Sequence, residues 1–190
     1  MSPEPADATL SVALKEWAVV CGALETGRQI VLLRKGGILE SLSGFDVEHR
    51  QFLLFPTYVH QNPEMLKTTE RAGIESRAEE PQRITLSSFA DVTDVIQLHD
   101  RSQIDAIDHE HIWSPPLIDM RFNYKPQNPL YLLVVRTFVL PRPVTIENTA
   151  AYAGCKSWVS LRESIDARDA RPALADARHE QRRARILRAL

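Results

Sequence analysis

One hydrophobic segment, residues 130–140 with the sequence LYLLVVRTFVL, most constrains how this chain folds. It is far shorter than the ~20 apolar residues needed to cross a bilayer, so we expect a buried β-strand and no membrane partner. Arg136 interrupts the segment. An unpaired charge in a core is too costly, so this arginine needs either a carboxylate partner or a ligand anion.

The rest of the chain alternates between helical and strand-like patterns. Apolar residues recur at three- and four-residue steps between 10 and 25, which predicts a helix. Other expected elements are strands at 30–33, 38–42, 52–55, 84–86, 92–98, 120–124, 144–146 and 158–161, a helix from Asn62 to near Gly73, and a helix from Asp100 to Trp113 stopped by Pro115-Pro116. We therefore predict an α+β class, a compact mixed domain with a central, mostly antiparallel sheet or small β-barrel flanked by helices.

The domain organisation follows from composition along the chain. We expect a disordered lead-in at 1–9, a single α+β domain at 10–165, and an Ala/Arg-rich helical tail at 166–190. A chain of 190 residues is long enough for one core of ordinary size. The tail is the one locally basic stretch, and it is either solvated or grips phosphate electrostatically.

Charge and cysteine content limit the classes of function. The formal net charge is −2, so no overall basic field attracts nucleic acid, and a phosphate-binding surface must be a local patch. Two cysteines, Cys21 and Cys155, do not make a disulfide framework. With no signal-peptide pattern at the first residues, we expect a cytoplasmic protein.

The first candidate site is the turn Arg34-Lys35-Gly36-Gly37, which follows a short strand. Two cations followed by two glycines allow fixed positive charge and backbone N–H groups to converge on one anion. The alternative is an ordinary hairpin turn with solvated cations. Because no GxxxxGK[ST] or GxGxxG pattern is present, we expect no nucleotide-triphosphate or dinucleotide cofactor, and no other cofactor.

The second candidate site is the segment 56–61, which directly follows a buried strand. Strand ends hold functional side chains rigidly, and four side chains that can hydrogen-bond gather here, Thr57, Tyr58, His60 and Gln61. His60 is a candidate general acid/base because an imidazole titrates near neutrality. Glu40 and His49 lie between the two segments and could join them. The same polar residues could instead satisfy backbone groups and cap a helix.

A cluster of acidic residues and histidines at 105–111 is the obvious place to look for a metal site. On a helix, His109 and His111 are two residues apart and face different directions, unlike the paired ligands of an HExxH motif. We therefore predict a solvated acidic helix face and no metal site.

Several motifs resemble a bacterial family known as domain of unknown function 1802. They are ALKEW at 13–17, GRQ at 27–29, LLRKGGI at 32–38, FLLFPTY at 52–58 with His60-Gln61, YLLVVR at 131–136, and Tyr152 with Gly154-Cys155 and Ser157-Trp158. The resemblance covers residues 10–162 and implies no particular activity.

A looser resemblance is to the small β-barrels of the PUA family and its ASCH relatives, in which a helix leads into Gly-x-Lys and then an arginine near a strand end. The corresponding residues here are Gly27, Gln29 in place of the lysine, and Arg34. This resemblance implies RNA or modified-nucleotide binding, with Arg34 and Lys35 near the ligand.

Three functions remain open at this stage. In the leading hypothesis the chain binds RNA, DNA or a nucleotide, with phosphate held by the cations of the Gly-Gly turn and by Arg136. The first alternative is a metal-dependent phosphodiesterase or nuclease that uses His60, Glu40 and His49. The second is a protein-interaction subunit with no ligand.

Overall fold

The computed structural model describes residues 9–35, 38–41, 44–154 and 156–190. Its helices and strands are β1 Thr9–Trp17, α1 Ala18–Glu25, β2 Val31–Arg34, β3 Ile38–Ser41, β4 Gly44–Val47, β5 Gln51–Thr57, β6 Arg83–Leu98, α2 Arg101–Ala106, α3 Pro115–Asn123, β7 Leu130–Glu147, β8 Trp158–Asp166, β9 Arg171–Pro172 and α4 Asp176–Ala189. Short 3₁₀ helices lie at Pro63–Met65, Thr68–Gly73, Asp108–Glu110 and Ala150–Tyr152.

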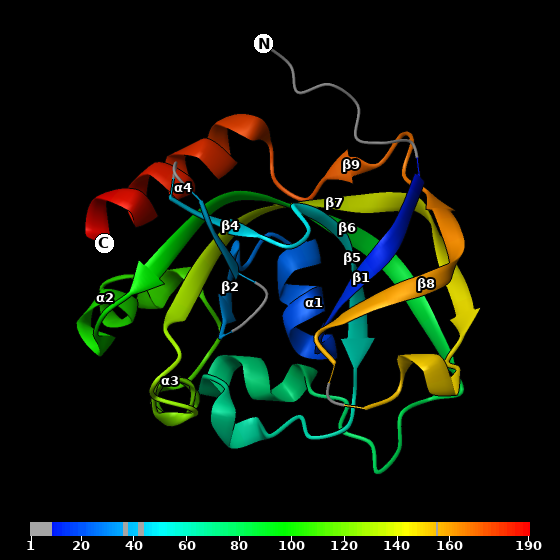
Figure 1. Ribbon diagram of the computed structural model, residues 1–190, viewed down its shortest axis with the longest axis horizontal. Coiled ribbons are helices and arrows are strands. Elements are labelled where there is room, and N and C mark those ends of the chain that lie inside the picture. Colours follow the sequence, from blue (N-terminus) through cyan, green and yellow to red (C-terminus); the bar gives the residue numbers. More distant parts are fainter. Residues whose placement is uncertain (1–8, 36–37, 42–43, 155) are drawn as a thin grey trace.

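A seven-stranded sheet dominates the structure, in the order β2-β7-β6-β5-β1-β8, with β9 also paired to β7. Only the β1–β5 pair is parallel among these strands; the other pairs are antiparallel. Figure 1 shows the sheet curving around α1, with α4 lying along its outside and α2 and α3 at one end. The α+β prediction is confirmed, and the sheet is open because the edge strands β2 and β8 do not pair with each other.

The sheet is buried on both faces at its centre, where two hydrophobic clusters lie on opposite sides of β5. Phe52 and Leu54 belong to the cluster around α1, and Leu53 and Phe55 belong to the cluster beneath β8. Successive residues of a strand point to opposite faces, so a strand buried on both sides has a continuous apolar sequence. This explains the run at 52–55. β5 nevertheless continues through Pro56 to Thr57, because from Leu54 onward it pairs with β1 alone and an amide donor is not required on its other side.

The predicted helix at 10–25 is wrong over its first half. Residues 9–17 form β1, and the helix begins only at Ala18. Leu10 and Leu14 have the spacing expected of a helix. The same residues also fit a strand that contains one irregularity, and β1 has such an irregularity, a register shift between Leu10 and Val12. Pairing with β5 and β8 on both sides decides in favour of the strand.

The region 100–124 also differs from its prediction. Asp100 caps α2 as expected, with its carboxylate accepting from the Ser102 N–H at 2.8 Å, but the helix ends at Ala106. Pro115 and Pro116 begin α3 instead of ending a helix, since a proline in the first turn lacks only an N–H that has no helical partner. The expected strand at 120–124 is therefore the end of α3 and its cap.

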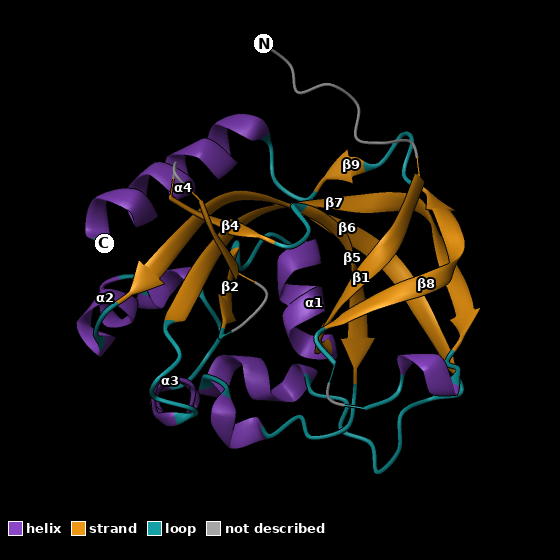
Figure 2. Ribbon diagram, viewed as in Figure 1, coloured by secondary structure: helices purple, strands orange, loops and turns teal. Residues whose placement is uncertain are grey.

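The C-terminal helix α4 packs against the domain, as Figure 2 shows. Ile186 is fully buried, and His179 and Arg182 are also buried. The His179 Nε2 lies 3.1 Å from the Val135 carbonyl oxygen of β7. Within the described ranges, no helix is long and apolar enough to cross a membrane.

Candidate functional site

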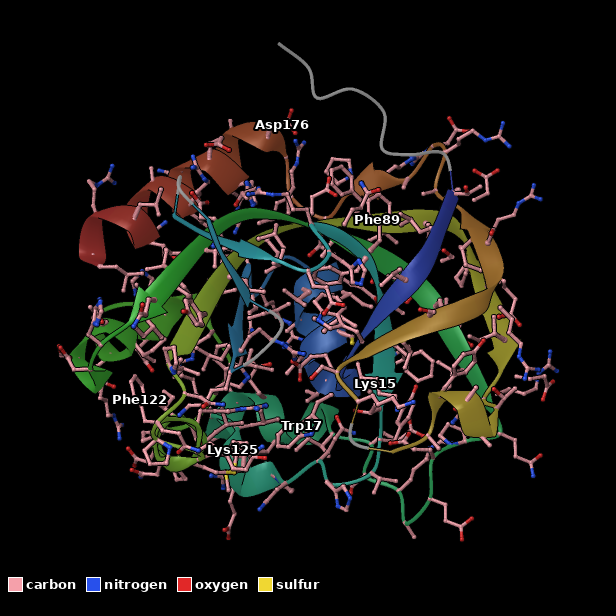
Figure 3. The ribbon with its side chains drawn as sticks, in the orientation of Figure 1. Lys15, Trp17, Phe89, Phe122, Lys125 and Asp176 are labelled. Atoms are coloured by element: carbon pink, nitrogen blue, oxygen red, sulfur yellow. The ribbon has the colours of Figure 1, made fainter. Side chains whose placement is uncertain are left out.

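A cavity of about 690 Å³ lies where β1 and β5 end, and we call it the strand-end cavity. Its walls come from the ends of three strands, from the segment after β5, from α3 and from the segment before β8. The lining residues are Lys15, Glu16, Trp17, Arg34, Phe55, Thr57, Val59, His60, Glu80, Arg121, Asn148, Thr149, Ala150, Tyr152, Ala153, Gly154, Lys156 and Ser157. Figure 3 shows Lys15 and Trp17 at this end of β1.

The parallel pairing of β1 and β5 creates this site. Trp17 is in register with Thr57, so both strands end at the same edge of the sheet. The carboxyl ends of parallel strands gather functional side chains because the sheet holds them rigidly. The Thr57 hydroxyl donates to the Glu16 carbonyl oxygen at 3.1 Å and ties the two ends together.

Two arginines and one carboxylate carry charge into the cavity lining, the buried Arg34 and Glu16 and the half-buried Arg121. Arg34 and Glu16 are each 8% exposed, and the Arg34 Nη1 lies 3.9 Å from the Glu16 Oε2. Burial lowers the pKa of Arg34, Glu16 opposes that change, and the positive charge of Arg121 lowers the pKa further. Glu16 also accepts from the Trp17 N–H at 2.9 Å. This part of the cavity lining thus holds two guanidinium groups and one carboxylate, which leaves local positive charge.

Hydrogen-bonding groups without a partner also line the cavity. The Arg121 Nε and the Thr149 Oγ1 are buried and have no hydrogen-bond partner in the described part of the chain. Both residues line the cavity. A buried polar atom without a partner is costly, so these two atoms indicate a place where a ligand or water accepts or donates.

The opposite wall is formed by the segment before β8, which Lys15 holds in place. The Lys15 Nζ donates to the Gly154 carbonyl oxygen at 3.1 Å and also to that of Tyr152. The Tyr152 hydroxyl accepts from the Arg162 N–H at 2.9 Å, and its ring meets Phe55 edge-on with centroids 6.0 Å apart. These contacts make a rigid floor beneath the cavity.

His60 lies at the rim of the cavity in a left-handed backbone conformation, with φ of 68°. Glu80 holds the preceding residues, since its carboxylate accepts from the N–H groups of Tyr58 and Val59, each at 3.0 Å. The cavity thus brings together three residues proposed from sequence, Arg34, Thr57 and His60.

Other proposed residues hold the structure together elsewhere. Gln61 is buried and accepts from the Val19 N–H at 3.0 Å, so it caps the start of α1. The Lys35 Nζ donates to the carbonyl oxygen of Phe122, in the last turn of α3, at 3.0 Å and to that of Lys125, just after the helix, at 3.2 Å. Tyr58 lies under the Arg77 guanidinium, 4.8 Å from its ring centroid.

Arg136 is separate from the strand-end cavity. It forms an ion pair with Asp176 at the start of α4, and its guanidinium lies 5.0 Å from the Phe138 ring centroid. In Figure 3, Asp176 lies at the top beside α4, well away from Lys15 and Trp17 in the middle and lower part of the view. The structure therefore gives Arg136 the carboxylate partner that was one of its two expected outcomes.

The remaining proposed residues lie on or next to the β3–β4 hairpin. His49 packs edge-on against Trp158, with ring centroids 5.2 Å apart, and does not line the cavity. Glu40 is in β3, in register with Phe45, but its side chain lies outside the described residues, as do Gly36 and Gly37.

The segment at 105–111 is not the solvated helix face that was predicted, because α2 ends at Ala106 and both Glu110 and His111 are buried. Asp108 pairs with Lys67 at 3.0 Å, and Glu110 pairs with Arg182 at 2.6 Å. The residues described by the structure contain no group of three or more metal-ligating side chains.

Sequence reasoning missed Glu16, Arg121 and Lys15. Glu16 and Lys15 fall in a segment predicted as helical, and Arg121 falls in one predicted as a strand, so none of the three was placed near Arg34. The available signal was Arg34 itself, because a buried arginine needs a carboxylate. Gln29, the departure from the ASCH pattern, accepts from the Ile112 N–H and donates to the Val31 carbonyl oxygen, and it is fully buried.

Comparison with known proteins identifies the family. Residues 13–185 match the family described as "Domain of unknown function (DUF1802)". The chain belongs to this family. The match extends into α4, beyond the range of the motifs that suggested it. A comparison with curated proteins finds no match.

The solved structures similar to this fold include an ASCH protein from Zymomonas mobilis. Its crystal structure is 13% identical, covers 91% of this chain and 92% of that one, and has a TM-score of 0.47. Two single-residue variants of that protein give the same TM-score at 14% and 15% identity, each over 80% of this chain and 88% and 90% of theirs. At this TM-score and identity, the likeness assigns neither a ligand nor an activity to this chain.

Proposed function

We propose that this DUF1802 protein binds a nucleotide unit, free or within a single-stranded nucleic acid, in the strand-end cavity. The observation that carries the proposal is the group of Arg34, Arg121 and Glu16 in the cavity lining, in which Arg34 lies 3.9 Å from Glu16 and the charge of Arg121 lowers the pKa of Arg34. Phosphate suits this group because guanidinium groups bind its oxygens through charge-assisted, often bidentate, hydrogen bonds.

The size and charge of the cavity support this class of ligand. About 690 Å³ lies within the range of pockets that hold small molecules. Four cations, Lys15, Arg34, Arg121 and Lys156, line it against Glu16 and Glu80. The Glu80 carboxylate is already engaged by two backbone N–H groups. Because the chain as a whole is weakly acidic, binding depends on this local charge.

Half-buried Trp17 supplies an aromatic surface at the same cavity, suited to stacking against a base. Phosphate would occupy the arginine side and the base the Trp17 side. A cytoplasmic location belongs to the same proposal, supported by the free and buried Cys21 thiol, which is typical of proteins without disulfides.

The test is titration calorimetry with nucleoside monophosphates and with single-stranded RNA and DNA oligonucleotides. Arg121→Gln removes charge from α3 without unpairing Arg34 and Glu16, and we expect about a 10- to 100-fold loss of affinity, the value of a charge-assisted hydrogen bond. Arg142→Gln, an exposed residue of β7 outside the cavity, is the matched control. Equal affinities of the two variants would rule out the proposed site.

A second candidate function is phosphodiester cleavage, favoured by the position of His60 at the rim of the same cavity. An imidazole beside bound phosphate can transfer protons to or from the reacting oxygens. Labelled RNA and DNA incubated with and without Mg²⁺ or Mn²⁺ would reveal cleavage, and loss of cleavage in His60→Ala with retained binding would favour the enzyme. Binding without cleavage in the wild-type protein would eliminate this candidate.

A further inference from the structure

A second cavity, of about 510 Å³, lies between α4 and the end of α1, and we call it the α4 groove. Its lining is mostly polar and carries more basic than acidic side chains. The lining residues are Thr26, Gly27, Arg28, Lys67, Glu70, His109, Glu110, His111, Ile112, Leu174, Arg178, Gln181, Arg182 and Arg185. Five of these are Lys or Arg and two are Glu, which gives the groove a positive balance in a protein of net charge −2.

The two carboxylates are already committed to neighbouring cations. Glu70 pairs with Arg28, and the buried Glu110 pairs with Arg182 at 2.6 Å and with Arg185 at 3.5 Å. Lys67 pairs with Asp108 outside the groove lining. Arg178 is exposed and has no ion pair among the described residues. The positive charge of the groove is therefore not cancelled within the protein.

The arrangement along α4 separates a structural arginine from accessible ones. Arg182 is 8% exposed and donates to Glu110 and to the carbonyl oxygens of Gly27 and Arg28. Arg178, Gln181 and Arg185 are exposed and follow one another at three- and four-residue steps, so they lie on one face of the helix. Arg182 fixes this face against Glu110 and the segment after α1, and the other three residues line the groove.

His111 gives an independent indication of a ligand. It is 4% exposed, lines the groove, and neither ring nitrogen makes a hydrogen bond of ordinary geometry within the described part of the chain. Burial, followed by the charge of Lys67, lowers the pKa of His111 to about 4, so the ring is neutral at pH 7. A neutral imidazole offers one donor and one acceptor, and the nearby backbone groups, which belong to Ile104 and Trp113, do not meet ordinary hydrogen-bond geometry.

We propose that the α4 groove is a second contact region for the phosphodiester backbone of a single-stranded nucleic acid, held by Arg178 and Arg185. A nucleic-acid backbone presents phosphate oxygens that accept from arginines and, in RNA, a 2′-hydroxyl that both donates and accepts, which matches the neutral His111. The identity of the ligand rests on the proposed function, but the groove shares no lining residue with the strand-end cavity.

The test measures how oligonucleotide affinity depends on salt. Each phosphate neutralised on a single strand contributes about 0.7 to the slope of log K against log salt, so Arg178→Gln with Arg185→Gln should lower the slope by about 1.4. The matched control, Arg142→Gln with Arg171→Gln, removes the same charge from exposed positions outside both cavities and should leave the slope unchanged. Gln181→Glu adds a negative charge while keeping every arginine and should also weaken binding.

Two results would overturn the proposal. One is an equal fall in slope for the groove variant and the control, which would indicate a general charge effect. The other is pyrophosphate binding that the groove variant abolishes while oligonucleotide binding stays unchanged, which would make the groove a site for free phosphate. RNA binding stronger than binding to DNA of the same sequence, with the difference lost in His111→Leu, would support contact with the 2′-hydroxyl.

Failure of this proposal can be told apart from failure of the proposed function. Nucleoside monophosphate binding that depends on Arg121 tests the strand-end cavity alone, because one nucleotide does not need the groove. The salt slope of oligonucleotide binding tests the groove alone, because the groove variant leaves Arg34 and Arg121 in place.

Discussion

Two buried arginine–glutamate pairs, one in each cavity, are held in different ways. In the strand-end cavity, Arg34 and Glu16 are 3.9 Å apart, and Arg121 lies close enough to lower the pKa of Arg34. In the α4 groove, Arg182 and Glu110 are 2.6 Å apart, and Arg182 also donates hydrogen bonds to the carbonyl oxygens of Gly27 and Arg28. A tight, fully bonded pair stabilises the fold, whereas a loose pair keeps donors available. Similar burial therefore serves structure in the α4 groove and, in the function that we propose, binding in the strand-end cavity.

Arg182→Met is expected to have the largest effect, because it leaves the Glu110 carboxylate buried without its main partner. The free energy of unfolding should fall by about 3–5 kcal/mol, measured by urea denaturation. Arg34→Met should cost less, about 1–2 kcal/mol, since Glu16 keeps its bond to the Trp17 N–H and faces an open cavity. Equal losses would contradict the contrast between the two pairs. Arg188→Met, exposed on the same helix as Arg182, serves as the control.

The pH dependence of stability should report on the α4 groove through His111. Its pKa is about 4 in the folded protein and about 6.5 in an unfolded chain, so between these values the unfolded state binds a proton that the folded state does not. Stability should therefore fall as the pH drops from 6.5 to 4, by about 3 kcal/mol from this residue alone. His111→Leu should lose this part of the fall when urea denaturation is repeated across that range. Parallel profiles for the two proteins would show that His111 is not buried as described.

Lys35→Met is expected to have the smallest effect and sharpens the contrast between neighbouring residues. The Lys35 ammonium donates to carbonyl oxygens at the end of α3, so its loss should cost about 0.3–1 kcal/mol in thermal denaturation. Nucleotide affinity should stay at the wild-type value, whereas Arg34→Met should lower it. A large loss of nucleotide affinity in Lys35→Met would show that Lys35 contacts the ligand, as first predicted from sequence. It would also mean that the contacts of Lys35 with α3 break when the ligand binds.

The strands were the more predictable part of the fold. The segments at 52–55 and 130–140 are apolar because their strands are buried on both faces, so burial is visible in their composition. β1 was predicted as a helix because its apolar spacing fits both periods, and the decision comes from pairing with residues 53–57 and 158–166, far away in sequence. Local patterns cannot carry that information.

The candidate site was predictable from sequence only at residues whose immediate neighbours mark them, such as polar residues directly after an apolar strand. Arg34 stands out because two cations follow an apolar strand, and Thr57 and His60 because they follow the next one. Glu16 and Arg121 are ordinary charged residues in sequence, and they gain their role only when β1, β2 and α3 meet at one edge. Gln61 illustrates the reverse, since its position beside the site suggested ligand contact while its amide caps α1.

The position of β1 between β5 and β8 also bears on how the chain reaches this structure during synthesis. β1 is synthesised well before β8, with which it pairs along one edge, Thr9 with Asp166 and Leu14 with Trp158. Contacts this far apart in sequence form slowly. Until β8 has been made, the apolar strand β1 presents an unpaired edge, the kind of surface that adds strands from other chains. The strand that carries Lys15 and Glu16 into the strand-end cavity is thus among the last to be enclosed.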